Sequence, residues 1–103
     1  MPGEYELTVG RISKNLGTAA TAEALSSSTL LVRSVVIQPE ETNTSDYIHV
    51  GTVNAAGCTF PVKKDASLTL GGDADEGDGR IDLAKIFIKV GTNGDDVEAL
   101  YVS

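Results

Sequence analysis

The densest group of residues that could do chemistry is one acidic, glycine-rich stretch, Gly71–Arg80, with the sequence GGDADEGDGR. An EF-hand calcium loop needs oxygen ligands early in the loop, glycine at position six and glutamate at position twelve. Counting from Asp73, position six is Asp78 and position twelve is Ala84. The stretch therefore departs from an EF-hand. We interpret Asp73–Asp82 as a solvated loop between strands, with a looser cation site as the alternative.

The chain has a single histidine, His49, and a single cysteine, Cys58. No second imidazole or thiolate stands near His49, so a zinc site would need distant carboxylates. A Cys–His pair for nucleophilic catalysis could form across a hairpin, but no sequence pattern around the thiol supports one. We therefore expect His49 to face outward on a strand and Cys58 to be a small buried side chain without an internal disulfide.

Three further motifs have simple structural interpretations. Ser26–Ser28 lacks the flanking glycines of a nucleophile elbow and is typical of a turn. Gly71-Gly72 begins no helix, so a phosphate-binding loop is not supported. Lys63-Lys64 indicates a solvated pair at a turn, and its alternative role is contact with an acidic patch on a neighbouring subunit. We assign no catalytic, cofactor-binding or metal-binding residues and expect that the protein is not an enzyme.

Composition limits the class of protein. The 103 residues correspond to one domain, and 41% of them are hydrophobic, which is enough for a core. No run of about 18 apolar residues occurs, so we predict no transmembrane helix, and the N-terminus lacks the pattern of a secretory signal. The net charge is -7, from 15 acidic and 8 basic residues. Phosphate contacts need clustered lysines and arginines, so we expect neither nucleic acid nor membrane as a partner.

The strongest structural signal lies between Leu83 and Val102, which reads LAKIFIKV, GTNGDD and VEALYV. Glycines between the two runs let the chain reverse, so the pattern predicts a β-hairpin whose apolar face is covered by the rest of the chain. Phe87 lies on the other face of its strand, where it either contacts another chain or is buried beneath the N-terminal segment. Alternation in the first run places three aliphatic side chains on one face: Ile86, Ile88 and Val90.

Short alternating segments recur along the rest of the chain. Glu4–Ile12 indicates a weak strand or extended arm, and Gly17–Ala24 indicates an extended or irregular segment. Thr29–Gln38 is rich in β-branched residues on both faces, which predicts a central strand covered on both sides and ended by Pro39. Further strands are predicted around turns at Asn54–Gly57 and Lys64-Asp65, over Tyr47–Val53, Phe60–Lys64 and Ser67–Leu70.

These segments together predict an all-β fold. We expect a small antiparallel β-sandwich or barrel of about six or seven short strands, with no helix. Residues 1–24 would form an extended N-terminal arm or weak strand, and residues 25–103 a single β-domain. The aromatic residues are three tyrosines and two phenylalanines. We expect most of them to be packing residues, and the lack of tryptophan argues against a sugar-binding face.

From about Leu25 to the end, the chain resembles a group of small virion proteins of tailed bacteriophages. Such sequences carry an I-x-V-G strand, a glycine-bearing turn, a polar S-L-T-L strand and a terminal L-x-x-I-x-V hairpin, in this order. Gly72–Arg80 is an insertion relative to them, and the first residues have no counterpart. The pieces that carry the resemblance are Val32–Ile37, Asn43-Thr44, Tyr47–Gly51, Phe60–Val62, Ser67–Leu70 and Asp82–Val90.

The resemblance implies a virion structural protein without an active site, either a capsid decoration (cement) protein or another head-associated module. Such a protein would bind the outer head surface and bridge capsid subunits, after synthesis in the bacterial host cytoplasm. Its partners would be the major capsid protein and copies of itself, with a trimer favoured where three shell subunits meet. The alternatives are a tail, neck or head-fibre component, and a carbohydrate-binding or adhesion module.

Overall fold

The computed structural model describes residues 9–19, 21–52, 57–71 and 80–103. These residues form ten strands and one short 3₁₀ helix, η3 (Leu83–Lys85). The predicted all-β sandwich is confirmed, with more strands than expected because several are only two residues long.

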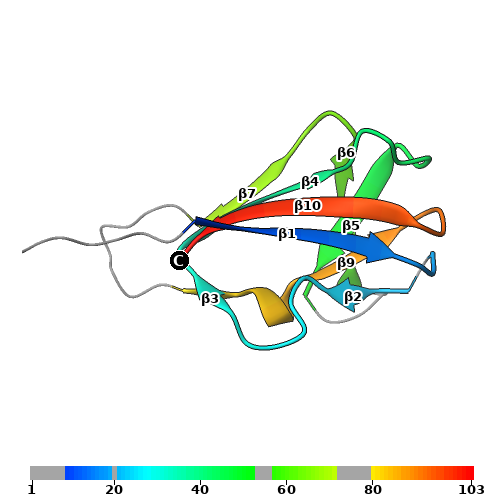
Figure 1. Ribbon diagram of the computed structural model, residues 1–103. Coiled ribbons are helices and arrows are strands. Elements are labelled where there is room, and N and C mark those ends of the chain that lie inside the picture. The colour runs from blue at the N-terminus through cyan, green and yellow to red at the C-terminus, as the bar shows by residue number, and fades with distance from the viewer. Residues whose placement is uncertain (1–8, 20, 53–56, 72–79) are drawn as a thin grey trace, which may run out of the picture.

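Two four-stranded antiparallel sheets pack against each other, and a small ribbon lies at one end (Figure 1). Sheet A has the order β1 (Val9–Leu16), β10 (Asp95–Val102), β4 (Ser34–Pro39) and β7 (Leu68–Gly71). Sheet B has the order β2 (Glu23–Ala24), β9 (Phe87–Val90), β5 (Tyr47–Gly51) and β6 (Phe60–Lys63). The ribbon, sheet C, pairs β3 (Leu31–Val32) with β8 (Ile81–Asp82).

Strand β4 corrects the prediction for Thr29–Gln38. Val35 and Ile37 are fully buried between the sheets, but Val36 on the opposite face is only half-buried. The strand is therefore covered on one side and not on both. The apolar run also contains two strands, because Leu31–Val32 pair with β8 before the chain enters β4. Because these two short strands follow each other in the sequence, the run looks like one strand with apolar residues on both faces.

The hairpin predicted between Leu83 and Val102 is wrong in its pairing. β9 pairs with β2 and β5 in sheet B, whereas β10 pairs with β1 and β4 in sheet A. The chain crosses from one sheet to the other over residues 91–94. Gly94, the last of them, has a φ of 87°, which glycine adopts without strain. The turn at Lys64-Asp65 is present, but it too joins strands of different sheets, β6 and β7. Alternation cannot separate a hairpin from a crossing, because both arrangements turn an apolar face towards the core.

One apolar core fills the space between the two sheets. The predicted inward faces of residues 83–90 and of β5, with Ile48 and Val50, are confirmed by their burial. Leu16 at the end of β1 is also fully buried, so the N-terminal part of the described chain contributes to the same core. The buried aliphatic residues are Leu16, Leu25, Val32, Val35, Ile37, Ile48, Val50, Val62, Leu83, Ile86, Ile88, Val90, Val97 and Ala99.

The N-terminal segment supplies one edge strand to each sheet. β1 pairs with β10 along its whole length, and β2 pairs with β9. Lys14 Nζ lies 3.2 Å from a carboxylate oxygen of Glu23, so an ion pair joins the two edges. Residues 1–8, which hold most of the predicted strand Glu4–Ile12, lie outside the described residues, as do Val53 of the predicted strand Tyr47–Val53 and residues 54–56 of the predicted turn.

A group of hydrogen bonds, which we call the loop latch, joins two of the crossings from sheet to sheet, β4–β5 and β9–β10. The Asp95 carboxylate accepts bonds from the backbone N–H groups of Thr44 at 2.9 Å and Ser45 at 3.1 Å, and Asp95 is only 4% exposed. The Asn43 side chain donates to the Asp96 carbonyl at 2.8 Å and accepts from the Asp96 N–H at 2.7 Å. The hydroxyls of Ser45 and Thr92 add a bond of 2.7 Å. The latch therefore fixes the β4–β5 loop against the start of β10.

We expect Asp95→Ala to lower the free energy of unfolding by about 3 kcal/mol, because two N–H groups lose a charged acceptor. Urea denaturation measures this loss. Asp96→Ala is the matched control, since its backbone can still pair with Asn43 while its carboxylate loses one bond from Asn15. The control should lose less than about 1 kcal/mol. Equal losses in the two variants would contradict the role assigned to Asp95.

Candidate interaction surfaces

The outer face of sheet B gathers positive and aromatic side chains. The register places Tyr47 opposite Lys63, and it places His49 opposite both Pro61 and Lys89. Tyr47 is 45% exposed and Lys63 is also exposed. None of the described strand residues on this face is acidic. We call the group Tyr47, His49, Lys63 and Lys89 the basic face, a local excess of positive charge on a chain of net charge -7.

The aromatic residues depart partly from expectation. Phe87 is half-buried on the outward side of β9, opposite Gly51 of β5, and its contact with another chain stays a prediction. Tyr101 packs against the core, as expected. Tyr47 and Phe60 are instead largely exposed, and Tyr5 lies outside the described residues, so the expectation that most of the aromatic residues pack stays a prediction.

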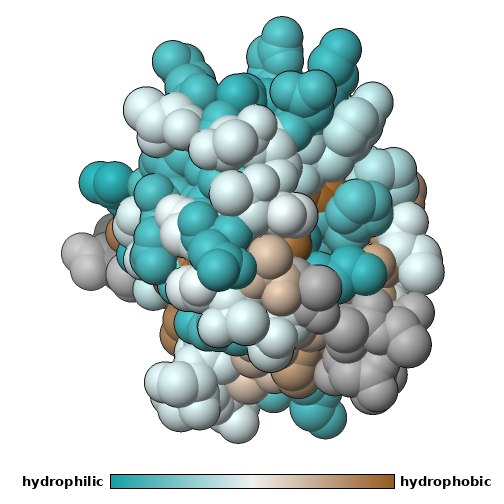
Figure 2. Space-filling view, turned by 90° about the vertical axis from the view of Figure 1, so that its right-hand side faces the viewer, coloured by the Kyte–Doolittle hydropathy of each residue, from teal (hydrophilic) through white to brown (hydrophobic). Residues whose placement is uncertain are grey.

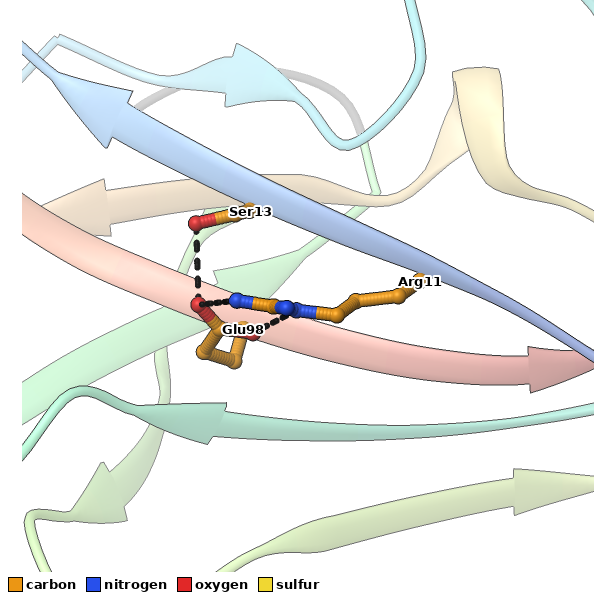
Figure 3. A network of polar contacts seen from close by, with 3 residues as sticks. All are labelled: Arg11, Ser13 and Glu98. Carbon is orange, nitrogen blue, oxygen red and sulfur yellow. Dashed lines mark hydrogen bonds and ion pairs between the residues drawn. The ribbon is translucent and has the colours of Figure 1, made fainter.

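The outer face of sheet A is organised around one carboxylate, Glu98 of β10 (Figure 3). Arg11 of β1 donates to it through Nε at 2.8 Å and Nη2 at 3.2 Å, and the Ser13 hydroxyl donates at 2.8 Å. The hydrogen bond from Arg11, followed by those from Glu40 and Ser13, lowers the pKa of Glu98 to about 2. The network joins β1 to β10 across the sheet surface.

Glu40, which follows β4, belongs to the same network, but its pKa shifts in the opposite direction to that of Glu98. Its pKa is raised, first by its hydrogen bond with Glu98, then by burial and by the negative charges of Glu98 and Asp96. The two glutamates therefore titrate as an interacting pair. The outer face of sheet A changes from charged to apolar along β10. The next outward residue after Glu98 is Leu100, which is 53% exposed and lies beside the half-buried Val36.

The lowered pKa of Glu98 gives the network a pH dependence. A carboxyl group whose pKa falls from 4.5 to about 2 on folding stabilises the fold above pH 4.5 and loses that contribution as the pH falls towards 2. The raised pKa of Glu40 acts with the opposite sign and offsets part of it.

We therefore expect Glu98→Gln to be less stable than the wild type at neutral pH, with a difference that shrinks as the pH falls from 4.5 towards 2. Urea denaturation at a series of pH values measures both curves. Glu41→Gln, at an exposed position next to Glu40, is the control for the loss of one negative charge. A stability difference that is the same at every pH would contradict the assignment.

The sandwich is open on the side where β6 ends sheet B and β7 ends sheet A. The register puts Phe60, Leu68 and Leu70 on the core side of their strands. Phe60 is nevertheless 54% exposed, and both leucines are only half-buried. They line a hollow of about 360 Å³ together with Val50 and Ile86, and all the described residues around it are uncharged. We call this hollow the open seam.

The end of the sandwich at which β9 runs into β10 is mainly hydrophilic, with apolar surface confined to small patches (Figure 2). A second hollow, of about 410 Å³, is lined by Lys64 together with Glu41 and Asp65. The predicted solvated pair Lys63-Lys64 is thus divided between two surfaces, because Lys63 is exposed on the basic face while Lys64 is half-buried in the turn.

His49 and Cys58 are not joined as a catalytic pair. Cys58 is 1% exposed, and its thiol donates to the Phe87 carbonyl at 3.5 Å, whereas His49 lies on the outward side of β5. Burial raises the pKa of the Cys58 thiol, and the nearby charge of Lys89 offsets part of that rise. The expected outward histidine and small buried cysteine are both confirmed.

We expect the Cys58 thiol to react far more slowly with a chromogenic disulfide reagent in the native protein than in denaturant, because it is buried and protonated. The reaction is unambiguous, since the chain has one cysteine. Glycine substitution of a surface residue far from it, such as Ser27→Gly, should leave the native rate unchanged. A native rate equal to the denatured rate would contradict the burial of Cys58.

The remaining sequence motifs fall at structural positions. Ser26 Oγ donates to the Ser28 carbonyl at 2.6 Å and accepts from the Ser28 N–H at 3.3 Å, which confirms the predicted turn. Asp82 is the N-cap of η3 and accepts from the Ala84 N–H at 3.0 Å. Residues 72–79 lie outside the described residues, so a cation site there stays a prediction.

Within the described ranges, no three or more histidine, cysteine or acidic residues lie close enough together to hold a metal ion. The same ranges contain no helix long and apolar enough to cross a membrane.

Sequence reasoning missed both the basic face and the open seam. Alternation in β9 places Lys89 on the outward face, but its neighbours on β5 and β6 follow only from the long-range pairing of these strands. The seam depends on which two strands end the sheets, and alternation carries no signal for this order. Exposed Phe60 beside Pro61, a residue typical of edge strands, was the nearest local signal.

Comparisons with protein-family models, with curated protein sequences and with solved structures gave no match to this chain.

Proposed function

We propose that this protein is a virion structural protein of a tailed phage, a capsid decoration protein that binds the outer surface of the head and bridges capsid subunits. The proposal starts from the resemblance of residues 25–103 to small virion proteins. Its pieces coincide with structural elements: Tyr47–Gly51 is β5, Phe60–Val62 lies in β6, and Asp82–Val90 contains η3 and β9. The resembling residues therefore include much of the sandwich and of its outer surface.

The basic face is the observation that supports binding to the capsid and indicates which surface binds. Its lysines stand on an acidic chain, so an acidic partner surface is attracted to this face and repelled by most others. This charge distribution orients the protein on its partner. Tyr47, 45% exposed beside Lys63, supplies a rigid aromatic contact of the kind enriched in protein interfaces. We assign the basic face to contact with an acidic patch of the capsid shell.

A decoration protein needs no single tight site. Many identical copies on one shell give many weak contacts, and a protein that bridges two shell subunits gains from each of them. Surface lysines suit such contacts, because rim charges steer association and select the partner more than they add affinity. Binding through the basic face should therefore weaken as the salt concentration rises.

We expect phage heads that carry the protein to withstand higher temperatures before releasing their DNA than heads that lack it. Calorimetry or a DNA-release assay on purified heads measures this difference. The copy number per particle, from quantitative gel analysis, separates a decoration protein, with hundreds of copies as a rough expectation, from a neck or tail part with few. Absence from purified heads, or heads equally stable with and without it, would exclude the role.

A pair of charge-reversal variants tests the surface. Lys63→Glu reverses a charge on the basic face, and Lys64→Glu makes the same change one residue later, outside that face. We expect Lys63→Glu to lose head binding at physiological salt and Lys64→Glu to retain it. Loss in both variants, or in neither, would contradict the assignment of the basic face.

A further inference from the structure

Among the described residues, neither the lining of the open seam nor strand β7 carries a charged side chain, and Leu68 and Leu70 belong to both. Phe60, Leu68 and Leu70 face the core side of their strands yet remain partly in solvent. Within the described residues β7 is the last strand of sheet A, so its second edge pairs with no described strand. An unpaired strand edge beside exposed apolar side chains is a template for another strand.

The other sheet edges are protected. β6 contains Pro61, which has no N–H to donate to a ladder. β1 has the charged Lys14 on its core side, held by Glu23 of β2. β7, with the sequence Leu68-Thr69-Leu70-Gly71, has neither a proline nor a charge. It is therefore the edge best suited to pairing with another strand.

We propose that a second copy of this chain pairs with this one through β7, antiparallel and about a two-fold axis at Thr69. Directly opposed residues of an antiparallel pair share a face, and this register sets Leu68 against Leu70 of the second copy and Thr69 against its own equivalent. The leucines of both copies then meet on the core side, and the threonines meet on the outer side. Sheet A continues into the second copy, and the two open seams close against each other.

The chemistry of the surface favours a second copy as the occupant. Two chains of net charge -7 repel each other, and an uncharged contact adds no local repulsion to this; the described residues of the seam carry no charge. The sequence of β7 is self-complementary in the register given, which is the requirement of a two-fold interface. This inference does not depend on the proposed function. It predicts a dimer through the seam, whereas the resemblance implies a trimer.

The test is the mass in solution of the full-length protein, by light scattering and sedimentation over a range of concentrations. The Thr69 side chain is exposed in one copy, so Thr69→Lys and Thr69→Glu should fold normally, as circular dichroism can verify. Each variant sets like charges against each other at the two-fold axis and should raise the dissociation constant roughly 5-fold. An equimolar mixture of the two should recover the wild-type value, because opposite charges then face each other. Thr29→Lys, at an exposed position outside β7, is the matched control.

Phe60→Ser provides an independent measurement, because it removes an exposed ring from the seam without changing charge. We expect it to weaken the dimer roughly tenfold, because the exposed part of the ring is removed from water only in the dimer. A wild-type protein that is monomeric at all concentrations, or trimeric, would overturn the proposal. So would a dimer that is unaffected by Phe60→Ser, or Thr69 variants whose mixture fails to recover the dimer.

Discussion

The buried carboxylate of Asp95 is the constraint on which the rest of the sandwich depends. A carboxylate removed from water is tolerated only where donors surround it, and here the backbone N–H groups of Thr44 and Ser45 supply them. These donors belong to the loop that leads from sheet A to sheet B, while Asp95 begins the strand that returns from sheet B to sheet A. One group thus ties together two crossings that lie about fifty residues apart in sequence. Together with the shared apolar core, this tie fixes how the two sheets lie against each other.

Once the sheets are held in this way, their outer faces are free to differ. The core uses one face of each strand, so the other face does not need to be apolar and can carry charge. Sheet B presents lysines beside Tyr47, and sheet A presents Glu98 with Arg11 at one part and Leu100 at another. The two sides differ as well, because Lys14 and Glu23 join β1 to β2, whereas the side of β6 and β7 remains apolar and open. A body with distinct faces suits assembly with other proteins.

The sequence predicts what depends on near neighbours. The all-β class, the inward faces around Ile88 and Val50, the outward His49 and the buried Cys58 follow from alternation and residue type, and the structure has them. Pairing partners are not encoded locally, so β9 and β10 were expected to form a hairpin although they lie in different sheets. The loop latch and the Arg11–Glu98 network each join distant segments and were missed for the same reason. The basic face and the open seam each combine residues from several strands, so they can be recognised only once the strand order is known.

Amide hydrogen exchange at Thr44 and Ser45 tests this account most directly. Both amides lie in a loop, where exchange is ordinarily fast, but both donate to the buried Asp95 carboxylate. If the latch holds the two sheets together, they should exchange as slowly as the paired amides of β4 and β10 and lose protection together with them. Exchange as fast as that of exposed loop amides, while the strands stay protected, would show that the sheets are held together without the latch and would contradict the account.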